Sequence, residues 1–284
     1  IGLPIEWGWN RVVGTPVMRP GGASNVLGDH TMELQGKTII VTGASSGIGA
    51  AAALLFAAEG ANVVLGARRD TELRATAAKI AESGSGSAVV LAGDVRDEGY
   101  AQALVDLACD EFGSLDGAFN NAGIMGDMLP AAEMALSTWD EVIAVNLTSA
   151  FLAAKAQIPV MKKQGFGSIV FTSSFVGFSN GGLPGMGAYA ASKAGQIGLV
   201  RALASAHAAD GIRINALLPG GTITSVAGED NTGFFDFVAN LHPVKRMAKA
   251  EEIAQAAVFL LSDRSSFVTG SPMIADGGMS VRLA

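Results

Sequence analysis

Residues 38–49 read TIIVTGASSGIG, a short run of β-branched and apolar residues that leads at once into a glycine-rich turn. The residues behind the turn, 48–59, are rich in alanine and leucine and are typical of a buried helix. A strand, a glycine turn and a helix in this order place free backbone N–H groups and the positive end of the helix where a pyrophosphate can bind. This stretch therefore predicts a dinucleotide-binding α/β fold.

The three glycines of the turn have separate tasks in such a site. Gly43 allows the tight turn, Gly47 lets the backbone approach the phosphates, and Gly49 lets the helix pack against the strand. The other candidate cofactor-binding residues of the turn are Ser45, Ser46 and Ile48. The spacing G-x-x-x-G-x-G is by itself a weak signal, because glycine-rich turns are common, and its place on the first strand–helix unit strengthens it.

The rest of the chain alternates short apolar runs with alanine-rich helical stretches. The expected strands span residues 38–42, 62–65, 88–91, 115–119, 168–172, 213–217 and 273–275. The expected helices span residues 48–59, 71–82, 98–112, 138–163, 188–208 and 250–262. Strands that are apolar throughout are buried on both faces, and their alternation with helices implies a parallel sheet. We predict one doubly wound domain of the Rossmann type over residues 32–284, with a seven-stranded parallel sheet and helices on both faces.

Composition and charge narrow the class of protein. Hydrophobic residues make up 49% of the 284 residues, ample for a core, and a net charge of −7 argues against nucleic-acid binding. The longest apolar run, 47–58, is shorter than the about 20 residues that a bilayer span needs. The single cysteine, Cys109, is expected in the core, and the histidines have no zinc-like spacing. We expect a soluble, cytoplasmic protein without a metal, a nucleic-acid partner or a membrane contact.

Residues 1–31 do not share the strand–helix pattern. They contain two of the three tryptophans, and a well-formed start appears only at Met32. They have no basic region before an apolar core with a cleavage site, so they do not resemble a secretory signal. Two interpretations stay open: a tag, cloning remnant or mistranslated stretch, or an arm whose Trp7 and Trp9 dock on the domain or on a neighbouring subunit.

The end of the second expected strand bears on the choice of cofactor. An NAD site usually carries an acid there, which holds the ribose 2′-hydroxyl. Here the strand ends in LGARR, residues 65–69, and the next acid, Asp70, fits a helix cap better. An arginine can pair bidentately with a 2′-phosphate, which a carboxylate would repel. Arg68 therefore predicts NADP(H); a solvated surface arginine is the alternative.

The segment AYAASK, residues 188–193, places Tyr189 and Lys193 four residues apart on one helix face. A phenol has a pKa of about 10 and is a poor acid–base catalyst at neutral pH unless a nearby cation stabilises its anion. Lys193 is the candidate cation, and an exposed helix pair is the alternative. The fifth expected strand ends in Ser173 and Ser174, where a hydroxyl could bind a substrate oxygen.

Together these residues resemble the short-chain dehydrogenase/reductase family, and the resemblance extends from Met32 to the C-terminus. Further elements occur in the family's order. Asp94 and Val95 resemble its adenine contact, and residues 120–123, with Asn120, Ala122 and Gly123, resemble its NNAG element. The nicotinamide-side turn is represented by Pro219, Gly220, Thr222 and Thr224, and the C-terminal signature by residues 276–278.

The resemblance implies a catalytic tetrad. In reduction, Tyr189 would give its proton to the carbonyl as hydride arrives from the nicotinamide. Lys193 would lower the pKa of Tyr189 and hold the nicotinamide ribose, while Ser174 would orient the substrate oxygen. Asn146 would bend its helix and anchor a water that relays protons to Lys193. Ser174 precedes Tyr189 by fifteen residues, two more than in most members, so the loop 177–187 is expected to be longer and Ser173 is the fallback.

Segment 223–247 breaks the strand–helix rhythm, which fits a mobile substrate lid. Its apolar residues either face the substrate or pack on the body: Phe234, Phe235, Phe237, Val238 and Leu241. We expect an apolar carbonyl or alcohol substrate. The resemblance also implies a homotetramer built partly on helices 138–163 and 188–208, with the C-terminal strand as a second contact.

Three functions are consistent with these features. The first is an NADP(H)-dependent reductase of a ketone or 3-oxoacyl group, which would also oxidise the corresponding secondary alcohol. The second is an NAD-dependent secondary-alcohol dehydrogenase, against which Arg68 argues. The third is a non-catalytic dinucleotide-sensing protein, which would have no need of the tyrosine–lysine pair.

Overall fold

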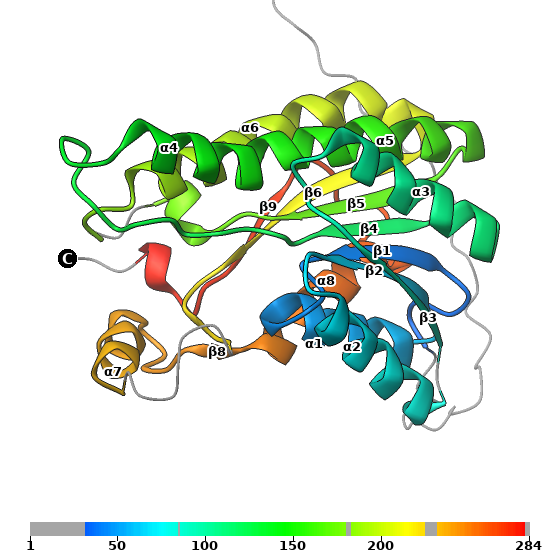
Figure 1. The fold of residues 1–284 in the computed structure, drawn as a ribbon, viewed down its shortest axis with the longest axis horizontal. Coiled ribbons are helices and arrows are strands. Elements are labelled where there is room, and N and C mark those ends of the chain that lie inside the picture. Colours follow the sequence, from blue (N-terminus) through cyan, green and yellow to red (C-terminus); the bar gives the residue numbers. More distant parts are fainter. Residues whose placement is uncertain (1–31, 85, 180–182, 225–231, 282–284) are drawn as a thin grey trace, which may run out of the picture. The chain divides into compact units, whose positions relative to one another are not determined.

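A computed structural model describes residues 32–84, 86–179, 183–224 and 232–281. Seven parallel strands form one sheet in the order β3-β2-β1-β4-β5-β6-β9 (Figure 1). Their bounds are Thr38–Thr42 (β1), Asn62–Ala67 (β2), Ser87–Ala92 (β3), Gly117–Asn120 (β4), Gly167–Thr172 (β5), Ile212–Pro219 (β6) and Pro272–Ala275 (β9). The predicted fold class, a doubly wound parallel sheet, is confirmed. The predicted extension, residues 1–31, lies outside the described residues.

Helices cover both faces of the sheet (Figure 1). One face carries α1 (Gly47–Ala58), α2 (Asp70–Ser83) and α8 (Ala250–Leu261); the other carries α3 (Glu98–Phe112), α5 (Ser149–Gln164) and α6 (Gly187–His207). Successive residues of β1 point to opposite faces, so Ile39 and Val41 belong to one core and Ile40 to the other. All three are fully buried, so the centre of β1 is apolar on both faces. Cys109 of α3, expected in the core, is only half-buried.

The expected helix 138–163 differs most from the prediction. It consists of α4 (Leu136–Ile143), a π-helical turn (Ala144–Thr148) and α5, which follow one another without a break. In the π turn a backbone N–H bonds five residues back, as Ser149 N does to Ala144 O. The turn takes up one extra residue without interrupting the helix, and such turns are frequent at functional sites.

This continuous run, Leu136–Gln164, is also long and apolar enough to cross a membrane by length and composition alone. The sequence analysis considered only the longest uninterrupted apolar run, 47–58, and therefore missed this longer helix. In the structure, 61% of its most apolar window is buried inside the protein. The core helix of a soluble protein passes the same test, so the run is weak evidence for a membrane span.

The segment after β6 departs from the strand–helix alternation, as expected. It contains the short strand β7 (Thr222–Ile223), which pairs with β8 (Ala248–Lys249), and between them the helix α7 (Thr232–Leu241). Residues 225–231 of the predicted lid lie outside the described residues, and so do residues 180–182 of the predicted longer loop.

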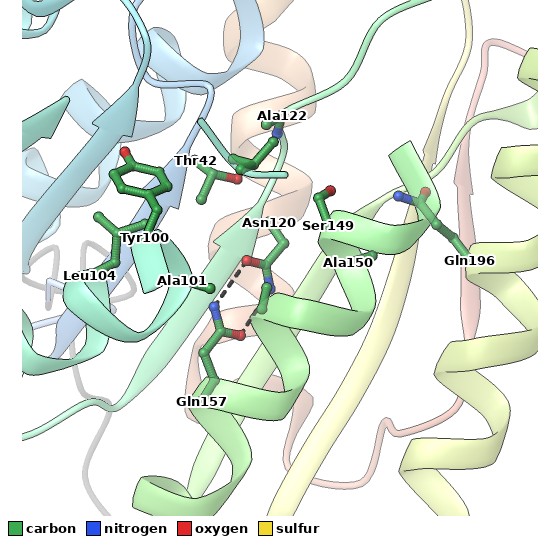
Figure 2. A pocket seen from close by; sticks show the side chains of 12 residues that line it. Thr42, Tyr100, Ala101, Leu104, Asn120, Ala122, Ser149, Ala150, Gln157 and Gln196 are labelled. Carbon is green, nitrogen blue, oxygen red and sulfur yellow. Dashed lines mark hydrogen bonds between the residues drawn. The ribbon is translucent and has the colours of Figure 1, made fainter. Parts of the chain in front are cut away.

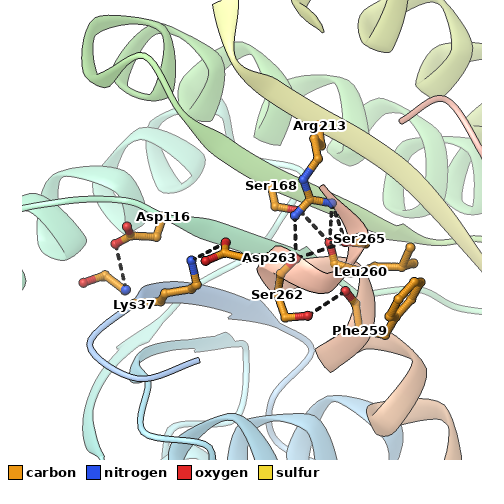
Figure 3. Close-up of polar contacts among 10 residues, drawn as sticks. Lys37, Asp116, Ser168, Arg213, Phe259, Leu260, Ser262, Asp263 and Ser265 are labelled. Carbon is orange, nitrogen blue, oxygen red and sulfur yellow. Dashed lines mark hydrogen bonds and ion pairs between the residues drawn. The ribbon is translucent and has the colours of Figure 1, made fainter. Parts of the chain in front are cut away.

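Polar contacts hold the N-terminal ends of the strands in place (Figure 3). Arg213 of β6 donates to the carbonyl oxygens of Leu260 and Ser262, at 2.8 and 3.0 Å, and to Ser265 Oγ. It thereby satisfies carbonyls at the end of α8 that have no partner within the helix. Asp116 Oδ2 accepts the backbone N–H of Thr38 at 2.9 Å, which ties β1 to the turn before β4. These contacts are structural. The candidate active site lies at the other end of the sheet, where the strands have their carboxyl ends.

Candidate active site

The glycine turn leaves the start of α1 open to an anion. Its N-cap, Ser46, makes no side-chain cap hydrogen bond, and the first turn of α1 contains no acidic residue. Gly47 has a φ of +55°, and a Cβ there would come within 3.0 Å of Thr224 Cγ2. The start of α1 therefore has backbone N–H groups without a side-chain cap and no carboxylate in its first turn, as a dinucleotide pyrophosphate requires. Thr224, from beyond β6, forms the wall opposite.

Two arginines follow β2, and the second of them contacts the glycine turn. Arg69 Nη2 donates to Ser45 Oγ and Ser46 Oγ, both at 2.9 Å. Arg68 is exposed, and its charge helps to hold the pKa of Asp94 below its usual range, although the hydrogen bond from Arg96 is the main cause. Asp70, expected to cap a helix, is instead the first residue of α2, and Arg69 is the N-cap. Sequence reasoning therefore missed Arg69.

The NNAG element after β4 is held by hydrogen bonds with Gln157 of α5 and Thr42 of β1. Asn120 and Gln157 of α5 exchange two side-chain hydrogen bonds of 3.0 Å each, so the Asn120 amide braces the sheet on α5 (Figure 2). Thr42 Oγ1 accepts the backbone N–H groups of Asn121 and Ala122 at 3.0 and 3.2 Å. The side chain of Asn120, a predicted cofactor-binding residue, is thus paired with Gln157, and Thr42 is a residue that sequence reasoning missed.

Gly123 brings this element against the predicted tetrad. A Cβ at Gly123 would lie 3.2 Å from Asn146 Oδ1 and 3.3 Å from Lys193 Nζ. Only a residue without a side chain leaves this space free beside the lysine. Asn146 and Lys193 therefore both border the space at Gly123.

Tyr189 and Lys193 lie on the first turns of α6, and they are not an exposed pair. Lys193 is 3% exposed, and its Nζ donates to the Thr172 carbonyl at the end of β5 over 2.7 Å. The same Nζ lies 5.6 Å from the centre of the Tyr189 ring. The lysine is therefore held against the carboxyl end of the sheet, with the tyrosine beside it.

The two serines after β5 have different partners. Ser173 Oγ donates to the main-chain carbonyl of Lys193 at 2.8 Å, so this hydroxyl is committed to the fold. Ser174 forms a side-chain hydrogen bond with Tyr189 and accepts the backbone N–H of Val176 at 3.3 Å. The geometry favours Ser174 over the fallback Ser173 as the serine beside the phenol.

Asn146 is fully buried in the π turn, where the resemblance implies a bend. Its Oδ1 accepts the backbone N–H of Ile124 at 2.9 Å, and its Nδ2 donates to Ile124 O and to Ser192 Oγ at 2.8 and 3.0 Å. The side chain thus joins the loop after β4 to α6, one residue before Lys193.

Burial shifts the pKa values of Tyr189 and Lys193 in opposite directions. Burial raises the pKa of Tyr189, and the hydrogen bond with Ser174 lowers it. Burial lowers the pKa of Lys193 to about 7. Lys193 Nζ donates to the Thr172 carbonyl, and the expectation that Lys193 lowers the pKa of Tyr189 stays a prediction.

The nicotinamide-side turn is held by a histidine that sequence reasoning passed over. Pro219 ends β6, and Thr222 Oγ1 donates to Gly220 O at 3.0 Å. The buried His242 accepts the backbone N–H of Gly221 at Nε2 over 3.0 Å, and its Nδ1 lies 2.8 Å from Val238 O of α7. A single histidine without a spaced partner gives no sequence signal for this role. Within the described ranges no cluster of His, Cys, Asp or Glu could hold a metal ion.

Known proteins share this architecture. Residues 43–280 match a family model described as enoyl-(acyl carrier protein) reductase. The chain is 43% identical over 252 residues to 2,5-dichloro-2,5-cyclohexadiene-1,4-diol dehydrogenase of Sphingobium indicum, covering 87% of this chain and 98% of that protein. It is 40% identical to the 3-oxoacyl-(acyl-carrier-protein) reductase of Thermotoga maritima, covering 88% and 100%. The crystal structure of levodione reductase superposes with a TM-score of 0.83 at 34% identity, covering 88% and 99%.

Proposed function

Because the chain belongs to the short-chain dehydrogenase/reductase family, and so is an oxidoreductase, we propose that it uses NADP(H) to interconvert a ketone or 3-oxoacyl group and the corresponding secondary alcohol. The observation that carries this proposal is the phenol of Tyr189, hydrogen-bonded to Ser174 and next to the buried Lys193, at the edge where the open glycine turn lies.

In the proposed mechanism each side chain has one task. A bound nicotinamide supplies the hydride in reduction and takes it in oxidation. Tyr189 gives its proton to the carbonyl oxygen, and the raised pKa of the buried phenol keeps that proton in place until the oxygen becomes basic. Ser174 hydrogen-bonds the same oxygen and orients it. Lys193 would hold the ribose hydroxyls of the bound cofactor, and Asn146 ties the loop after β4 to α6.

An apolar substrate fits the surroundings of the tyrosine. The loop after β4 approaches the segment before α6, since a Cβ at Gly185 would lie 2.8 Å from the main chain of Met128. Tyr189 packs against a buried apolar cluster formed by Phe175, Val176, Met186 and Met279. One relative acts on a chlorinated cyclohexadienediol and another on a 3-oxoacyl group. A panel of cyclic ketones and 3-oxoacyl thioesters, followed by NADPH absorbance, tests the proposal; no turnover with any of them would contradict it.

The parent enzyme is expected to prefer NADPH over NADH, and Arg68→Asp should abolish the preference. A charge-assisted bidentate pair with a phosphate contributes about 1.5–3 kcal/mol, which is roughly ten- to a hundredfold in affinity. Arg69→Ala should also weaken NADPH binding, because it removes the guanidinium that stands over Ser45 and Ser46. The measurement is kcat/KM for both cofactors. Arg74→Asp, the same charge change on an exposed residue one turn along α2, is the control. Equal kcat/KM for both cofactors in the parent would contradict the proposal that the enzyme uses NADP(H).

We also propose a homotetramer that uses α5, α6 and the C-terminal strand. Phe151 on α5 is 51% exposed and Phe267, ahead of β9, is fully exposed, so both could pack on another subunit. Light scattering is expected to give about four times the 28.8 kDa mass of one chain, and Phe151→Asp should lower that mass. A monomer at micromolar concentration would refute this assembly.

A further inference from the structure

The main-chain carbonyl of Asn146 has a side-chain partner that nothing above explains. Gln196 Nε2 donates to Asn146 O over 2.6 Å, and Gln196 is 2% exposed. It lies on α6 three residues after Lys193, so the two side chains come from adjacent turns of one helix. Two residues of α6 therefore bind Asn146: Ser192 accepts from its side chain, and Gln196 donates to its backbone carbonyl.

The other end of the Gln196 amide is unpaired. Its Oε1 is buried and has no hydrogen-bond partner among the described residues. Gln196 is one of the residues that line a cavity of about 20 Å³, together with polar residues of β1, β4, α3 and α5: Thr42, Asn120, Tyr100, Ser149 and Gln157 (Figure 2). A volume of that size holds one water, and a buried amide oxygen without a donor is costly. A water in this cavity would supply the hydrogen-bond donor that Gln196 Oε1 lacks.

We propose that Gln196 is a positioning residue for the reaction, and that one buried water in this cavity donates to its Oε1. The water fixes the amide, the amide fixes the Asn146 carbonyl, and the π turn stays at one distance from Lys193. This inference builds on the proposed function, because it assigns Gln196 a part in the same reaction. Asn146 and Lys193 both border the space at Gly123, so a shift of the turn changes the shape of that space.

Removal of the amide tests the proposal first. Gln196→Leu keeps the volume but can neither donate to Asn146 nor accept from the water. The expected result is a loss in kcat on the order of tenfold with the KM for NADPH within about twofold, because a misplacement of about 1 Å can cost up to a hundredfold. Gln164→Leu is the matched control. That glutamine also bonds main-chain atoms, the N–H and C=O of Leu115, but at the far end of α5. It should lower Tm and leave kcat unchanged.

Gln196→Glu separates positioning from mere stability through its pH profile. A carboxylate would face the Asn146 carbonyl without a donor, whereas the protonated acid donates to it as the amide does. Burial raises the pKa of such an acid, so the kcat of this variant should recover towards the parent value as the pH falls. A ratio of variant to parent kcat that is constant with pH would overturn the positioning role.

Crystals of the parent and of Gln196→Leu give a readout that needs no turnover. The parent should show a water within hydrogen-bond distance of Gln196 Oε1, and the variant a displaced Asn146 turn. An empty cavity, or a turn in the same place in both, would overturn the inference. If instead the parent reduces no carbonyl compound while the water and the displacement are seen, the proposed function fails and the structural link stands.

Discussion

Tyr189→Phe is expected to lower kcat by about 10²–10⁴-fold, which is the usual contribution of a positioned acid–base group. The change removes one hydroxyl from a half-buried ring, so the packing of α6 and the glycine turn should survive. Affinity for NADPH should stay within a few-fold, because the phenol is not expected to hold the phosphates. Ser174 loses its hydrogen bond with the phenol as well, but its proposed bond to the substrate oxygen remains.

The chain contains a matched control, since it has two tyrosines. Tyr100 donates to Leu91 O at 2.7 Å, and burial raises its pKa to about 12. Tyr100→Phe therefore removes the same hydroxyl from a structural site, and about 1 kcal/mol of stability should be its main effect. Steady-state kinetics and thermal melts of both variants distinguish the two tyrosines. Near-parental turnover in Tyr189→Phe, on any substrate that the parent accepts, would remove the proposed mechanism.

The fold was readable from the sequence because buried parallel strands are uniformly apolar. Ile39, Ile40 and Val41 leave no doubt of burial on both faces, and the structure places them in two cores. Strand ends were less certain. Leu115, expected in the fourth strand, precedes it and exchanges main-chain hydrogen bonds with the side chain of Gln164 instead. Hydrophobicity reports that a residue is buried, but it does not report where its backbone groups find partners.

Features of the site that depend on direction rather than on residue type were not predictable. Ser173 and Ser174 are chemically identical, and adjacent residues of an extended chain point to opposite sides, so only the structure distinguishes them. Arg68 and Arg69 pose the same problem at the end of β2. The π turn at Asn146 leaves no mark either, because one extra residue within a long helix hardly alters its hydrophobic pattern. Resemblance to a family places Asn146 there; periodicity alone does not.

Lys193→Met is expected to lose activity and cofactor affinity together, unlike Tyr189→Phe. Methionine fills a similar volume but cannot donate to ribose hydroxyls, so affinity for NADPH should fall roughly ten- to a hundredfold. Because the pKa of Lys193 is about 7, the ammonium form is present below that pH and is lost above it. Parental affinity should therefore weaken as the pH rises from 7 to 9. The variant should show no such slope, and Lys79→Met, which changes an exposed lysine, should keep the parental slope.

Stability separates this loss from misfolding, and its sign follows from the same pKa. The folded pKa of Lys193, about 7, lies below the value of about 10.4 for a free lysine, so the buried charge destabilises the fold most at and below pH 7. This cost fades towards pH 10. The lost hydrogen bond to Thr172 O opposes the gain at every pH. The difference in Tm between Lys193→Met and the parent should thus shift in favour of the variant as the pH falls from 9 to 7. A difference that does not change with pH, measured by calorimetry, would show that the lysine is not buried as a charge.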